Sequence, residues 1–166
     1  MLNDIYNMSF LYRDSRQSLN IIVIFSSTPP PNPQYYEYLQ ESGFQPTDAA
    51  RWVMHWGDNG KPSPSQMDTP VTYVSLNDAR AMCKHRKMRL PDVHEWTYLA
   101  QGADGRRYPW GNIWNDSFVP AISHNFTNPG PEPVGRYPLG ASPYGVEDLV
   151  QSVWQLTTEF EDDHTR

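Results

Sequence analysis

The residues that could carry redox or metal chemistry are few in this sequence. Cys83 is its single cysteine, so no internal disulfide can form and a two-thiol mechanism has no second thiol. The five histidines are scattered, and no two of them have a chelating spacing on one helix face. There is no zinc-binding pattern either. Residue types and spacing therefore indicate no catalytic residue and no cofactor-binding residue.

A second conspicuous group is aromatic, with one arginine: Arg89, Trp96, Tyr108, Trp110 and Trp154. One interpretation is a ligand groove lined by rings. The other is a packed framework in which Arg89 binds loop carbonyls. Large aromatic side chains are buried for most of their surface in globular proteins. We favour the framework.

Charge and hydropathy exclude several classes of function. The formal net charge of the 166 residues is −6, and the single basic cluster, over residues 80–89, is interpreted as the solvated face of a helix rather than a nucleic-acid site. The longest apolar run, residues 19–25, is too short to span a bilayer. The N-terminus lacks the basic start and apolar run of a signal peptide. We expect a cytoplasmic protein whose partners are neither nucleic acid nor membrane.

The first element that must position these residues is a helix over residues 32–44. Asn32 is a suitable N-cap and Gly43 a suitable left-handed C-cap. The long connection that follows contains Trp52 and Trp56, spaced like neighbours on one helical turn. We expect these two tryptophans to attach the connection to the body of the domain.

Two further helices are predicted by capping patterns. A short strand over residues 71–73 leads into a helix that starts with the capping-box pair Ser75 and Asp78, and the single cysteine falls on its core-facing side. A third helix begins after Asp92 and ends at Gly102.

The rest of the chain predicts short, irregular elements. Turn signals alternate with apolar pairs after the third helix, and "SVWQLT" at residues 152–157 predicts a strand. Helices followed by short strands are typical of an α+β fold. The proline-rich stretch at residues 26–31 marks a boundary, so we expect a separate N-terminal segment, residues 1–31, and one domain, residues 32–166.

Four motifs occur in a fixed order within residues 32–166: "PVTYVSLNDARAMC", "RLPDVHEWTYLAQG", "DGRRYPWGN" and "PVGRYPLGASPYGVEDLVQSVWQLT". In them the sequence resembles the formylglycine-generating enzyme, or sulfatase-modifying factor, domain family. Its ergothioneine-biosynthesis relatives are the most similar in these motifs. The resemblance implies an irregular α+β fold similar to C-type lectins, with short helices, short strands and long loops. It does not extend to residues 1–31.

The resemblance implies descent from oxidoreductases. The best-known members oxidise a sulfatase cysteine to formylglycine with reactive cysteines and copper, and others form C–S bonds with iron held by a separate helical domain. Neither the cysteine-bearing C-terminal segment nor the iron-binding histidines have a match here. We expect a C-terminally incomplete domain, inactive as this chain, with no identifiable copper or iron site. Its partner would be a fused or separate catalytic domain, or a peptide or thiol substrate. The alternative is a non-catalytic module that binds a ligand or a protein.

The resemblance also implies structural calcium. The positions that match the family's ligands are Asp148, Gln151, Val153 and Gln155, with Gln155 in place of a glutamate. Calcium takes about six to eight oxygen ligands, and carboxylates set its affinity. A second calcium site of the family begins at the position of Asn125, where we find no acidic partner.

Two positions depart from the family's glycines. Lys87 stands where a glycine usually follows the helix, so we expect a left-handed lysine or a shifted helix end. Gln151 replaces the glycine of a tight turn, which makes that turn harder to form.

Overall fold

The computed structural model describes residues 30–46, 49, 51–121 and 130–158. Its α-helices are α1 (Asn32–Ser42), α2 (Leu76–His85) and α3 (Val93–Gln101). Single 3₁₀ turns are η1 (Met54–Trp56), η2 (Pro64–Gln66), η3 (Asp116–Phe118) and η4 (Pro138–Gly140). None of the helices in this part of the chain has the length and apolar character needed to cross a membrane.

The described residues form isolated β-bridges but no regular strand. Isolated bridges join Pro31 to Pro70 and Tyr108 to Gly111. The strand predicted over residues 71–73 is therefore wrong, and of the strand predicted over residues 152–157 only one bridge residue, Leu156, is present. Tyr73 has a φ of 56°, and its carbonyl accepts the Val53 N–H at 2.8 Å, so the chain turns there instead of continuing a ladder. The predicted helices are confirmed, whereas the lectin-like arrangement stays a prediction.

Capping boxes start α2 and α3 as the sequence predicts. The Ser75 hydroxyl accepts the Asp78 N–H at 3.2 Å, and the Asp78 carboxylate accepts the Ser75 N–H at 2.6 Å. Asp92 and Glu95 repeat this exchange at 2.8 and 2.9 Å. Each pair satisfies two donors that a helix start leaves without partners. Gly102, with a φ of 69°, ends α3.

The start of α1 differs from the prediction. Pro31 occupies the N-cap position, and no side chain caps this helix. Asn32 is instead fully buried and bonds to a distant segment. The C-terminal prediction is confirmed, because Gly43 is left-handed and its N–H donates to the Leu39 carbonyl.

Lys87 ends α2 in a left-handed conformation, with a φ of 59°. The Met88 N–H donates to the Cys83 carbonyl at 2.8 Å, and the Lys87 N–H donates to the Lys84 carbonyl at 3.1 Å. This is a Schellman-type ending, which usually has glycine at the left-handed position. The expected left-handed lysine is confirmed.

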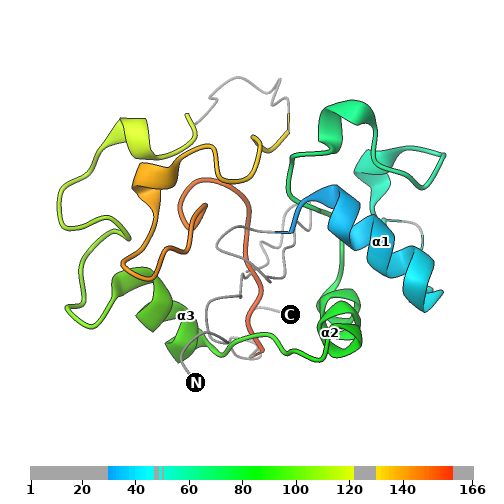
Figure 1. Cartoon of the computed structure of the whole chain (residues 1–166), viewed down its shortest axis with the longest axis horizontal. Coiled ribbons are helices and arrows are strands. Elements are labelled where there is room, and N and C mark those ends of the chain that lie inside the picture. The colour runs from blue at the N-terminus through cyan, green and yellow to red at the C-terminus, as the bar shows by residue number, and fades with distance from the viewer. Residues whose placement is uncertain (1–29, 47–48, 50, 122–129, 159–166) are drawn as a thin grey trace.

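The core consists of two clusters of buried side chains. The first gathers residues of α1, α2 and the connection between them, together with Leu90 and Leu156; the second contains Leu99, Ala100, Val146 and Leu149. In Figure 1, α1 and α2 lie side by side on the right, α3 lies on the left, and the orange-to-red segment descends between them. That segment places Leu156 in the first cluster.

The connection after α1 is attached by its two tryptophans, as predicted. The indole of Trp52 donates to the Tyr35 hydroxyl at 3.2 Å, and that of Trp56 donates to Asn32 Oδ1 at 2.6 Å. Both rings also pack edge-on against Tyr35. The helical turn predicted for the two tryptophans is reduced to η1. The residue before it, Val53, has a left-handed conformation.

Candidate functional site

Cys83 lies on the core-facing side of α2 and is 1% exposed. Burial raises the pKa of its thiol to about 12, because desolvation disfavours the thiolate. The thiolate is the form that attacks electrophiles and binds metals. At neutral pH this cysteine is a protonated, inaccessible thiol, and the prediction that it is a small buried hydrophobe is confirmed.

No three His, Cys, Asp or Glu side chains gather as a metal site anywhere in the described part of the chain. His55 bonds to Asn32, and His85 lies against Glu41 at 3.1 Å. His94 is exposed on α3. The three histidines in the described part of the chain thus have different surroundings, and His124 and His164 lie outside it.

The turn predicted to hold calcium is organised by hydrogen bonds. Asp148 is 7% exposed, and its Oδ2 accepts the Gly135 N–H at 2.7 Å. Burial raises the pKa of the Asp148 carboxyl above its ordinary value. The Gln155 Nε2 group donates to the Asp148 carbonyl at 2.9 Å, and Gln155 Oε1 accepts the indole N–H of Trp96 at 3.0 Å. The oxygen expected to face a cation therefore faces an indole.

The remaining predicted calcium positions fall into two groups. Gln151 forms its tight turn with a φ of 58°, at the position that the family fills with glycine. Val153 follows in the same segment as a half-buried residue. Asn125 lies outside the described residues. Retained calcium at any of these positions stays a prediction.

Arg89 acts as part of the framework. Its guanidinium donates to the Leu90 carbonyl at 3.1 Å, as predicted, and to both carboxylate oxygens of Glu95 at 2.6 Å. The bidentate pair was not indicated by the sequence. It holds the pKa of the Glu95 carboxyl below its ordinary value. Because Glu95 also caps α3, Arg89 orders the start of that helix.

Tyr108, Trp110, Trp114 and Phe118 form an aromatic surface cluster. Tyr108 and Trp110 stack with centroids 5.4 Å apart, and Trp114 meets Tyr108 edge-on at 5.2 Å. Phe118 meets Trp110 edge-on at 5.8 Å. Trp114 is 37% exposed, and the neighbouring Ile113 is 83% exposed. Trp154, half exposed, is likewise not a core residue, so the framework interpretation is incomplete for these rings.

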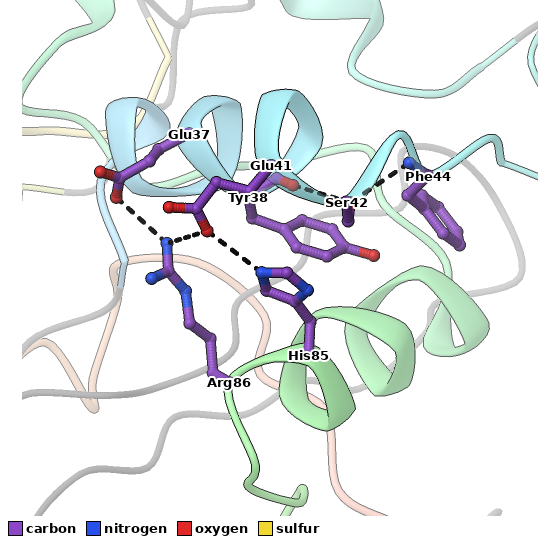
Figure 2. Close-up of polar contacts among 7 residues, drawn as sticks. All are labelled: Glu37, Tyr38, Glu41, Ser42, Phe44, His85 and Arg86. Atoms are coloured by element: carbon purple, nitrogen blue, oxygen red, sulfur yellow. Dashed lines mark hydrogen bonds and ion pairs between the residues drawn. The ribbon is translucent and has the colours of Figure 1, made fainter.

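The basic cluster is partly neutralised by α1. Figure 2 shows Arg86 and His85 reaching from α2 toward the acidic face of α1. The Arg86 guanidinium lies 3.1 Å from Glu37 and 3.7 Å from Glu41. The interpretation as a solvated face fits the exposed lysines of the cluster, and Arg86 on that face pairs with exposed carboxylates of α1. This pairing leaves less free positive charge for a polyanion.

A buried polar contact between His55 and Asn32 was missed by sequence reasoning. Asn32 Oδ1 accepts from His55 Nε2 at 2.9 Å, while its amide nitrogen donates to the carbonyls of Gln66 and Thr69 at 3.0 and 2.9 Å. Burial lowers the pKa of the His55 imidazole to about 4. The contacts link α1 to the segment 34 and 37 residues later, a separation for which no local pattern exists.

Comparison with known sequences assigns the family. Residues 24–166 match the sulfatase-modifying factor enzyme 1-like domain, FGE-sulfatase. The chain belongs to this family. The predicted membership is thereby confirmed, and an FGE-sulfatase domain is what the described helices and loops form.

Relatives of the FGE-sulfatase chain have different recorded activities. An inactive C-alpha-formylglycine-generating enzyme 2 from Bos taurus is 36% identical over 121 residues, 68% of this chain and 40% of that protein. A formylglycine-generating enzyme from Mus musculus is 33% identical over 103 residues, 55% of this chain and 27% of that protein. A hercynine oxygenase from Mycobacterium tuberculosis is 37% identical over 100 residues, 55% of this chain and 22% of that protein. The chain spans less than half of each relative.

Proposed function

We propose that this chain is a formylglycine-generating-type domain that carries out no thiol oxidation or C–S bond formation by itself. It serves as the folded frame of an oxidoreductase-derived protein. A fused or separate catalytic domain, or a peptide or thiol substrate, is its proposed partner.

One observation carries the proposal. The only thiol of the chain, Cys83, is 1% exposed, and its pKa is raised to about 12. Oxidation of a substrate cysteine by a thiol or copper–thiolate centre requires an accessible thiolate. Cys83 could provide one only if the packing of α2 were disrupted.

The relatives support the proposal without deciding it. The Bos taurus and Mus musculus proteins at 36% and 34% identity are named inactive. Proteins named formylglycine-generating enzyme and hercynine oxygenase match at similar identity, 33% and 37%. The state of the thiol is therefore the stronger argument.

The test is a turnover assay on the full chain. The chain, and a Cys83→Ser variant as matched control, are incubated with copper(I), oxygen and a cysteine-containing peptide, and aldehyde formation is followed by mass spectrometry. The formylglycine-generating enzyme of Mus musculus is the positive control. Both forms of the chain should produce no aldehyde above the copper-only background. Aldehyde above that background from either form contradicts the proposal.

A second candidate is a non-catalytic module that binds a peptide. Its supporting observation is the aromatic surface cluster, next to which Ile113 is 83% exposed, together with the 68% exposed Leu139 of η4. η3 and η4 are in contact, so Phe118 of the cluster and Leu139 lie on neighbouring turns. Exposed aromatic rings on a folded frame are common in binding sites.

The cysteine-containing peptide of the turnover assay also tests the second candidate. Its binding, measured by fluorescence anisotropy of a labelled peptide, should weaken about tenfold or more with Trp114→Ala. It should not change with Trp154→Ala, which removes another exposed tryptophan. Equal binding by all three chains, or none by any, argues against this candidate.

A further inference from the structure

The hydrogen bonds of Gln155 have only one possible direction. An indole N–H can only donate, and a backbone carbonyl can only accept. The Trp96 indole therefore requires the Gln155 oxygen at 3.0 Å, and the Asp148 carbonyl requires the Gln155 amino group at 2.9 Å. Turning the amide over would place donor against donor and acceptor against acceptor. The assignment of oxygen and nitrogen, which is often ambiguous for glutamine, is decided here by its two partners.

This direction conflicts with a cation. Calcium binds oxygens, and among the four expected positions only Asp148 has a carboxylate. The group that faces the Asp148 carbonyl is the amino end of an amide, whose partial charge is positive. The Gln155 oxygen, which stands where the family has a glutamate ligand, is bonded to the Trp96 indole instead, so a cation at this turn would meet a donor rather than an acceptor at position 155. The residues present do not fit calcium in the observed arrangement.

The Asp148 side chain is also engaged. Its Oδ2 accepts the Gly135 N–H at 2.7 Å, and the carboxylate is 7% exposed. The side chain and the carbonyl of Asp148 thus both have protein donors, Gly135 and Gln155 respectively. Hydrogen bonds of this kind satisfy buried acceptors without a metal.

We propose that the Gln155 amide replaces the family's calcium ion at this turn, so that the native turn is independent of calcium and Gln155→Glu makes it calcium-dependent. A glutamate at 155 would still accept the Trp96 indole N–H. It would, however, place a carboxylate oxygen against the Asp148 carbonyl oxygen, with no donor between them. A divalent cation would relieve that repulsion.

The experiment compares melting temperatures of the full chain in a chelator and in millimolar calcium chloride. The native chain and Gln40→Glu, a charge-matched change at an exposed α1 position, should melt at the same temperature in both buffers. Gln155→Glu should melt several degrees lower in the chelator and recover in calcium, since a ligand that binds only the folded state stabilises it. Magnesium at the same concentration should recover less, because it demands a smaller octahedral site.

Two results would overturn the proposal. The first is a native chain whose melting temperature rises with calcium and not with magnesium. The second is a folded Gln155→Glu that does not respond to calcium. If Gln155→Glu fails to fold in either buffer, the proposal is tested on the native chain instead, by NMR of the Gln155 side-chain amide. Its two proton resonances should stay unchanged by millimolar calcium, and a selective shift contradicts the replacement.

Discussion

The imidazole of His55 donates its Nε2–H to Asn32 Oδ1 over 2.9 Å, at a point where Asn32 is fully buried. Since the amide oxygen only accepts, this bond fixes the proton of the neutral ring on Nε2. His55 Nδ1 is buried and has no hydrogen-bond partner among the described residues. A second proton would have to enter there, without an acceptor.

We expect His55 to make stability depend on pH. Its pKa is lowered from 6.5 to about 4, so the unfolded state binds the proton more tightly. The stability that it contributes is fully present above the unfolded pKa of 6.5 and is lost as pH falls toward 4. The loss should be about 2 kcal/mol, allowing for the partial exposure of the ring. Urea unfolding across this pH range measures it.

Substitution separates His55 from other titrating groups. His55→Gln should flatten the pH dependence between pH 6.5 and 4, at some cost in stability at neutral pH. His94→Gln, at an exposed position of α3, should keep the native profile. Parallel profiles for the native chain and His55→Gln would show that another group is responsible.

Local signals predicted the helices well because their determinants lie within a few residues. Ser75 with Asp78, and Asp92 with Glu95, cap α2 and α3 as expected. Asn32 failed as a predicted cap because its side chain bonds to Thr69, which is distant in sequence. The predicted strand failed at Tyr73, whose carbonyl bonds to the Val53 N–H. Tertiary contacts outweighed local preference at both positions.

The candidate calcium site illustrates the same limit. The sequence identifies Asp148 and Gln155 and the lost charge at position 155. It does not reveal that Trp96, 59 residues earlier, would orient the amide. The exposure of Trp154 could not be predicted either, because large aromatic side chains are mostly buried and no local signal marks the exceptions.

Lys87→Gly should stabilise the chain. Lys87 has a φ of 59°, which costs an ordinary residue about 1 kcal/mol relative to glycine. Lys84→Gly, inside α2, should instead destabilise by up to about 1 kcal/mol, because glycine there only loses helix propensity. Urea unfolding of both variants measures the two changes in the free energy of unfolding, which should have opposite signs. The same sign for both substitutions would argue against strain at Lys87.

Gly102→Ala should destabilise by about 2–3 kcal/mol. Gly102 has a φ of 69°, and a Cβ there would lie 2.9 Å from Asp104 Oδ1 and 3.0 Å from Pro143 Cγ. Gly60→Ala is the matched control, with a φ of 59° and nothing within 4 Å of its Cβ. It should lose only about 1 kcal/mol, from conformation alone. Equal losses in thermal unfolding would mean that the close approach at Gly102 has no cost.

The accessibility of Cys83 tests the central claim, that the only thiol is a buried structural group, most directly. The measurement is the rate at which a disulfide reagent modifies Cys83 in the native chain and in the chain unfolded in urea, at one pH. With the side chain 1% exposed and its pKa raised to about 12, modification of the native chain should be at least about a hundredfold slower. Native and unfolded rates within about tenfold of each other would contradict the claim, because Cys83 would then be an accessible, reactive thiol.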